Sequence, residues 1–351
     1  MKTGAGKNKT LRVKLPIGLL CFVCVFILYC FSSENRIRVF SGATMGTSYT
    51  VKIVYQSSGV QIPDSSAGNA IDSLLILIND MMSVHDPNSG ISRFNDFNAT
   101  DWFAVPAELV FVVEKSLQVS KESKGAFDIT VSPLIDLWGF GKTGIHQSIP
   151  PAETIKKYSQ LVGYQYLKAR KQPPALRKHI PQLQCNLSAI AKGYGVDRIA
   201  AWLDNRGFTN YMVEIGGEIS SRGTNLQGAP WRIGISEPDE MGQIHRVVEL
   251  RDKAIATSGD YHNYFEKDGI RYSHTLDPRT GRPITHKLAS VTVIDSSCMM
   301  ADAYATAIDV LGPESGYEFA RENSLPVYML IRQEDGFKAE MTSLFSSTYL
   351  K

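Results

Sequence analysis

An uncharged run at residues 15–31 constrains this chain most, because it separates a short N-terminal segment from everything that follows. The segment before it contains no acidic residue and five basic ones, Lys2, Lys7, Lys9, Arg12 and Lys14. A helix made of the run would be about 25 Å long, slightly shorter than the hydrocarbon core of a bilayer. A basic flank followed by an apolar run is typical of an export signal or a signal-anchor. We therefore expect an N-terminal signal or anchor segment at residues 1–35 and a folded body at residues 36–351.

The end of this segment leaves two forms of membrane attachment open. Cys30 would be the lipidated residue of a lipoprotein, but the bulky Tyr29 precedes it, where signal cleavage favours a small residue. We therefore expect an uncleaved anchor first and a lipoprotein second, with the body on the periplasmic or outer side of the cell inner membrane. The body contains only Cys185 and Cys298, too few for a disulfide framework, so we expect two separate buried thiols.

Composition excludes several classes of protein for the body. The chain is 43% hydrophobic and 21% charged, which is typical of a globular protein and not of a disordered or fibrous one. Its net charge of +2 and the lack of a basic stripe interleaved with aromatic residues argue against nucleic-acid binding. We find no zinc signature, serine-hydrolase elbow or set of kinase loops, which argues against those enzyme classes.

Strands and helices follow one another without regular alternation. Residue patterns predict strands at 49–54, 211–215, 231–235 and 291–295, and helices at 71–82, 109–123, 189–205 and 301–311. Gly312-Pro313 should end the last of these helices. Residues 150–181 are the least patterned and should form a surface excursion. This mixture predicts an α+β fold rather than a doubly wound parallel sheet.

Asp302 and Thr306 form the densest functional signal. They are four residues apart in the predicted helix, so their side chains should share one face. A carboxylate and a hydroxyl are hard oxygen ligands that suit Mg²⁺ better than zinc, especially if phosphate oxygens complete the coordination shell. The alternative is an aspartate that caps the start of a helix, and these two residues alone favour that alternative.

Two glycine-containing segments could bind an anion or approach a ligand. A polar turn at residues 186–190 leads into a helix that carries Lys192, and a helix start beside a lysine can bind an anion. A capped helix with a solvated lysine is the simpler interpretation. Gly216 and Gly217 follow a strand and allow positive φ close to a ligand, although an ordinary hairpin turn needs the same residues.

His274 is the candidate for proton transfer, because Asp277 follows closely and could orient or charge its imidazole. A structural histidine is the commoner alternative. Residues 257–259 predict a loop rich in small hydrogen-bond donors. Residues 125–134 predict a turn that leads into a strand-like segment. The aromatic residues after this segment could stack on a flat ring of a ligand, or they could pack in the core.

Taken in order, these segments resemble the ApbE family of FAD:protein FMN transferases. The resemblance covers most of the body, from about residue 41 to residue 312. Its matching segments are Met45-Gly46-Thr47, 89–95, 125–134, 189–197, 215–218, 257–259, 274–281, and 301–303 together with Thr306. The resemblance implies a single large α+β domain of two intimately packed subdomains, with the flavin site in the cleft between them.

The resemblance also implies an activity and the residues that perform it. Members of the family transfer the FMN moiety of FAD to a threonine hydroxyl of a target flavoprotein, form a phosphoester and release AMP, with Mg²⁺ bound. The residues implied at the FAD site are Met45, Ala126, Phe127, Asp128, Asn186, Lys192 and Leu276. His85 stands where the family often has a tyrosine, and its imidazole would replace that ring beside the flavin; Asn186 stands where an aspartate is common.

The metal ligands and the general base are implied in the same way. Asp302 and Thr306 would bind Mg²⁺ through their side chains, and Ala189 through its backbone carbonyl. His274 would accept the proton of the acceptor hydroxyl. Two other functions would use the same residues, a Mg²⁺-dependent FAD pyrophosphatase that releases FMN and AMP, and a flavin-binding protein without turnover.

Overall fold

The structure is a computed structural model that describes Met1 and residues 34–57, 63–141, 148–238, 243–259, 264–267 and 270–350. The expected signal or anchor segment lies almost entirely outside the described residues. Within the described ranges, no helix is both long enough and apolar enough to cross a membrane.

A single antiparallel sheet organises the body. Its strands lie in the order β1-β2-β6-β7-β10-β15-β16-β17, and each pairs with its neighbour in the antiparallel sense. The strands are β1 (Asn35–Thr44), β2 (Thr47–Gln56), β6 (Tyr211–Ile215), β7 (Glu218–Arg222), β10 (Lys253–Gly259), β15 (Leu288–Asp295), β16 (Val327–Gln333) and β17 (Gly336–Met341). The predicted α+β class is therefore confirmed, whereas the division of the body into two subdomains stays a prediction.

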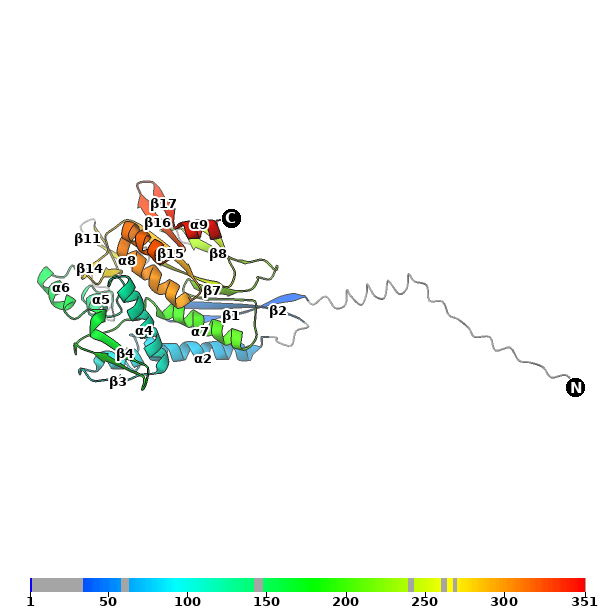
Figure 1. Cartoon of the computed structure of the whole chain (residues 1–351), viewed down its shortest axis with the longest axis horizontal. Helices are drawn as coiled ribbons and strands as arrows, with labels where there is room; N and C mark the ends of the chain where they lie inside the picture. The colour runs from blue at the N-terminus through cyan, green and yellow to red at the C-terminus, as the bar shows by residue number, and fades with distance from the viewer. Residues whose placement is uncertain are drawn as a thin grey trace.

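Helices cover one face of this sheet and a hairpin covers part of the other (Figure 1). The helices on the first face are α2 (Ser65–Met82), α7 (Ala191–Asn205) and α8 (Cys298–Glu322), and α4 (Ala107–Glu122) packs on α8. The opposite face packs against β8 (Trp231–Ser236), β9 (Ile244–Leu250) and α9 (Ser343–Tyr349). Successive side chains of β2 point to opposite faces of the sheet, so the strand contributes to a hydrophobic cluster on each face. Val51 and Ile53 pack under the helices, and Val54 packs on the other face.

Shorter elements complete the described part of the body. The helical ones are α3 (Gly90–Asp96), α5 (Ser132–Leu137), α6 (Ala152–Ser159) and η1 (Tyr164–Tyr166). The strands are β3 (Phe103–Ala104), β4 (Leu167–Arg170), β5 (Ala175–Lys178), β11 (Tyr264–Lys267), β12 (Ile270–Ser273), β13 (Leu276–Asp277) and β14 (Arg282–Pro283).

The strands predicted at 49–54, 211–215, 231–235 and 291–295 and the four predicted helices are present, with shifted boundaries. The predicted end at Gly312 is confirmed, because its φ of 78° breaks α8, but a second helical stretch resumes at Pro313. Cys185 and Cys298 are free and buried, as expected.

Three local predictions are wrong. Residues 150–181 contain α6, η1, β4 and β5 rather than an unpatterned excursion. Residues 125–134 form a turn that leads into α5 instead of a β-like run. Residues 257–259 are the end of β10, where they pair with β15, and not a loop.

Candidate active site

Helices α7 and α8 approach each other closely at Gly193. A Cβ atom on Gly193 would lie 2.4 Å from the carbonyl oxygen of Cys298, so a larger residue would push the helices apart. This close approach lets the Gly193 N–H donate a 3.0 Å hydrogen bond to Oδ2 of Asp302. The acid of the predicted metal site is thus oriented by the neighbouring helix.

The start of α8 is also anchored from α7. Asp197 accepts hydrogen bonds from the Ser297 hydroxyl at 2.7 Å and from the N–H groups of Cys298 and Met299 at 2.8 and 3.0 Å. Ser297 is the helix cap, since its Oγ accepts from the N–H of Met300. Asp302 lies more than a turn beyond that cap and is only 5% exposed. The alternative that Asp302 serves as the helix cap is therefore wrong.

Lys192 lies between two buried carboxylates. Its Nζ is 2.8 Å from Oε1 of Glu218 and 3.9 Å from Oδ1 of Asp302. Glu218 begins β7 directly after Gly216 and Gly217, whose φ values of 58° and 101° form the turn from β6. The side chain of Lys192 is only 28% exposed, so the alternative of a solvated lysine is wrong.

The charges of this cluster act on one another. Burial alone would lower the pKa of Lys192, but Asp302 and Glu218 outweigh it and raise that pKa, so Lys192 stays an ammonium. Burial raises the pKa of Asp302, and Lys192 only partly opposes it. Burial and the Asp302 charge raise the pKa of Glu218 as well. A positive charge beside Asp302 would relieve the cost of its ionisation.

A cavity of about 670 Å³ opens beside this cluster. It brings together most of the site residues expected from the sequence, namely Ala126, Phe127, Asp128, Asn186, Ala189, Lys192, His274, Leu276, Asp302 and Thr306. Met45 and His85 instead line a neighbouring cavity of about 360 Å³. Ser188 and Lys192 line both cavities, so the two spaces adjoin at these residues.

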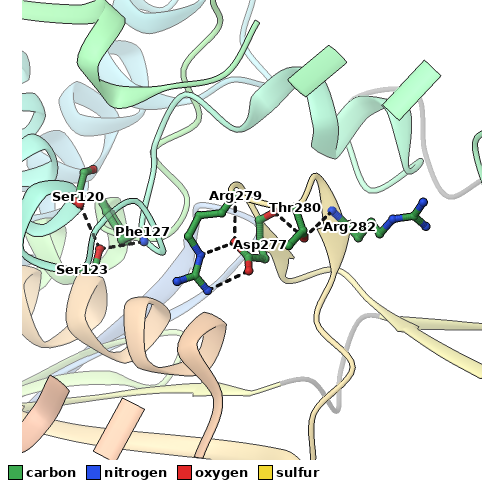
Figure 2. Close-up of polar contacts among 7 residues, drawn as sticks. All are labelled: Ser120, Ser123, Phe127, Asp277, Arg279, Thr280 and Arg282. Atoms are coloured by element: carbon green, nitrogen blue, oxygen red, sulfur yellow. Dashed lines mark hydrogen bonds and ion pairs between the residues drawn. The ribbon is translucent and has the colours of Figure 1, made fainter. Parts of the chain in front are cut away.

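Asp128 stabilises the turn that forms one wall of the larger cavity. Its Oδ1 accepts from the N–H and hydroxyl of Thr130 at 2.8 and 2.7 Å, and its Oδ2 accepts from the N–H of Tyr164 at 2.7 Å. The preceding N–H, that of Phe127, donates to the Ser123 hydroxyl at 3.1 Å, as Figure 2 shows. The carboxylate of Asp128 therefore has donors from the protein on both oxygens.

His274 reaches the same cavity from the segment between β12 and β13. Its ring packs edge-on against Phe140, with centroids 6.5 Å apart. The carboxylate of Asp277 is instead paired with Arg279: Nε donates to Oδ1 and Nη2 to Oδ2, each at 2.9 Å (Figure 2). The predicted pairing of Asp277 with His274 is therefore wrong.

Asp309 is a residue that the sequence interpretation missed. It is fully buried, and its Oδ2 accepts from the hydroxyls of Ser258 at 3.0 Å and Thr275 at 3.3 Å. It lies two turns after Asp302 in α8, so the helix face that carries Asp302 also fixes the residue next to His274. The signal was present in the sequence as a third polar residue at helical spacing.

The comparisons with known proteins agree with this fold. The family model described as the ApbE family matches residues 45–329. An FAD:protein FMN transferase of Vibrio cholerae is 44% identical over 307 residues, which are 87% of this chain and 90% of that protein. Another from Haemophilus influenzae is 36% identical over 337 residues, or 95% of this chain and 97% of that protein.

Solved structures give the same result. The flavin transferase ApbE from Vibrio cholerae superposes with a TM-score of 0.83 at 41% identity, over 90% of this chain and 100% of that one. The apo form of the flavinyl transferase ApbE from Pseudomonas stutzeri has a TM-score of 0.83 at 39% identity, over 90% and 98% of the two chains. The chain belongs to the ApbE family, as the motif series predicts.

Proposed function

We propose that this chain transfers the FMN moiety of FAD to a threonine hydroxyl of an acceptor flavoprotein, with Mg²⁺ bound and AMP released. The curated relatives are named FAD:protein FMN transferases, and the chain is an enzyme of that class. One observation supports the proposed Mg²⁺-dependent transfer to a threonine hydroxyl. Four residues suited to it, Asp302, Thr306, Lys192 and His274, line a single cavity.

The residues around Asp302 fit a magnesium ion. Asp302 is a buried carboxylate with one N–H donor on Oδ2, and Thr306 and Ala189 line the same cavity. The described part of the chain contains no group of three or more His, Cys, Asp or Glu suited to a metal. Mg²⁺ needs no such group, because it usually keeps water and binds phosphate oxygens. When bound, it would neutralise charge that develops on a pyrophosphate.

The paired cavities support FAD as the substrate. FAD has two ring systems joined by a pyrophosphate, and the two cavities adjoin at Lys192 and Ser188. The charged Lys192 is suited to the pyrophosphate, and Met45 and His85 would contact a ring in the smaller cavity. Ala126, Phe127 and Leu276 supply apolar surface to the larger one.

His274 is the proposed general base. The oxygen of the acceptor hydroxyl would form a bond to the FMN phosphorus while the bond from that phosphorus to the AMP oxygen breaks. The hydroxyl proton would pass to the imidazole, which lines the cavity. Exclusion of water by a bound acceptor would favour transfer over hydrolysis.

We also propose that the enzyme is exported and tethered to the cell inner membrane by residues 1–35, as an anchor or through Cys30. The basic flank and the uncharged run at 15–31 support this placement.

The experiment incubates the full chain in detergent with FAD, Mg²⁺ and a flavoprotein subunit that carries a candidate threonine. We expect a fluorescent covalent adduct and an equal amount of AMP, and no adduct when that threonine is replaced by valine. FMN and AMP without adduct would indicate an FAD pyrophosphatase. Tightly retained FAD without AMP would indicate a flavin-binding protein, and either result would overturn the proposal.

A further inference from the structure

Glu218 is a buried carboxylate with no part in the proposed reaction. It is 3% exposed and lines the larger cavity. Its Oε1 pairs with Lys192, whereas its Oε2 is buried without a hydrogen-bond partner among the described residues. A buried carboxylate oxygen without a donor costs free energy, so a residue in this state is expected to have a role beyond stability.

The two carboxylates beside Lys192 are at unequal distances. The 2.8 Å separation from Glu218 is a charge-assisted hydrogen bond, while the 3.9 Å separation from Asp302 is too long for one. The turn before β7 permits this geometry, since a Cβ atom on Gly216 would lie 3.3 Å from Cδ of Lys192 and 2.8 Å from Cγ2 of Thr47. Lys192 is thus drawn toward β7 and away from α8.

We propose that Glu218 is a positioning residue that holds the Lys192 ammonium away from Asp302 and so keeps the Asp302 carboxylate available to a divalent cation. This inference rests on the metal site of the proposed function. An ammonium in full contact with Asp302 would compete with the metal for the same oxygens. Without Glu218, Asp302 would be the remaining ion-pair partner of Lys192 among the described residues.

Two effects would weaken cation binding when Glu218 loses its charge. The first is the direct loss of a negative charge near the cation, which acts whether or not Lys192 is present. The second is the movement of Lys192 onto Asp302, which requires the lysine. Combining the substitutions separates the two effects, because only the second disappears when Lys192 is removed.

The test measures Mn²⁺ binding to the full chain without FAD, from the electron paramagnetic resonance signal of free Mn²⁺. Glu218→Gln keeps the side-chain shape and should weaken Mn²⁺ affinity at least about tenfold. In a Lys192→Met background, the same substitution should weaken Mn²⁺ affinity clearly less, because only the direct loss of charge remains. Glu214→Gln is the matched control, because it removes a carboxylate from the wall of the same cavity where no ion pair to Lys192 exists.

The outcomes distinguish the proposed role of Glu218 from the proposed Mg²⁺-dependent FMN transfer. If the wild-type chain binds no Mn²⁺, or if Asp302→Asn binds it equally well, the metal site is wrong. If binding depends on Asp302 but Glu218→Gln binds as tightly as the wild type, the role of Glu218 is wrong and the function stands. An equal weakening with and without Lys192 would also overturn the role.

A second variant protects the test against misfolding. Circular dichroism and the Tm of each variant would reveal a loss of structure. If Glu218→Gln unfolds, Glu218→Asp retains the charge but shortens its reach to Lys192, and it should still weaken Mn²⁺ affinity. Unchanged affinity in that variant would contradict the proposal.

Discussion

Asp128 and Asp302 are buried carboxylates on the wall of the same cavity, and their surroundings differ. Asp128 receives three hydrogen bonds from Thr130 and Tyr164, which engage both of its oxygens. Asp302 receives one, from the N–H of Gly193, and faces an ammonium at 3.9 Å. Burial raises the pKa of both groups, so burial alone does not distinguish them.

The two carboxylates differ in how many of their oxygen lone pairs remain available to coordinate a ligand. The donors around Asp128 come from its own turn and from η1, so its charge stabilises the shape of the wall. The single donor on Asp302 comes from a helix that also anchors the start of α8. Asp302 is therefore rigidly placed while Oδ1 keeps coordination capacity, which is the property that a metal ligand needs.

Substitution of Asp302 should have the largest effect on activity. Asp302→Asn keeps an oxygen for the N–H of Gly193 but removes the charge that would hold Mg²⁺, so FMN transfer should fall by at least about a hundredfold. The rate of adduct formation and the Tm measure activity and folding separately. A variant that retains Mg²⁺-dependent transfer would show that this carboxylate is structural, like that of Asp128.

His274 extends the comparison to another residue that lines the cavity. His274→Ala should slow transfer by about a hundredfold, because a positioned general base contributes that much or more. FAD affinity should change less than the rate, since the proposed role is proton transfer and not binding. Titration of FAD fluorescence beside single-turnover rates tests this, and an equal loss in both would make His274 a binding residue.

Substitution of Asp128 should act on stability. Asp128→Ala leaves a buried N–H group, a partly buried one and a buried hydroxyl without their acceptor, so the free energy of unfolding should fall by about 3 kcal/mol. Asp128→Asn is the control, because its amide oxygen still accepts and the loss should be smaller. Urea unfolding measures both. If Asp128→Ala kept its stability but lost transfer as completely as Asp302→Asn, the contrast between the two acids would be wrong.

The sequence predicts the regions whose structure depends on local periodicity. Val51 and Ile53 alternate with polar residues in β2, so the strand could be predicted. Asp302 and Thr306 repeat at helical spacing in α8, so the helix and the face that they share could be predicted as well. The metal site could be proposed on that basis, but the helix cap could not be dismissed. Ser297 excludes it only through a hydrogen bond that the structure shows.

The errors arise where distant residues decide the structure. The apolar and β-branched residues after Asp128 suggest a strand, but the bonds of Asp128 to Thr130 and to the distant Tyr164 hold a turn. Thr257 and its neighbours have the composition of a loop, yet pairing with β15 makes them a strand. A contact that the sequence did not predict also decides the partner of Asp277. The guanidinium of Arg279 donates to both oxygens of the Asp277 carboxylate, which the sequence had suggested as the partner of His274.

A pH series in a metal chelator gives the smallest expected effect. Burial raises the pKa of Asp128 and of Asp302 above the ordinary value of 3.8, so each ionises less readily in the folded than in the unfolded chain. The contribution of such a group to the free energy of unfolding is greatest below that ordinary value and falls as pH rises through the raised pKa. Wild type should therefore lose stability relative to each Asn variant as the pH rises above the ordinary value of 3.8.

Mg²⁺ should then separate the two acids. A bound cation favours the ionised form of its ligand, so at about ten times its Kd it should raise the free energy of unfolding of the wild type by about 1.4 kcal/mol at neutral pH. Asp128→Asn should gain the same amount, because its metal ligand is intact, and Asp302→Asn should gain nothing. Urea unfolding with and without Mg²⁺ measures each difference. Equal gains in both variants would mean that the ion binds elsewhere, and that the unequal hydrogen bonding of the two carboxylates does not determine their roles.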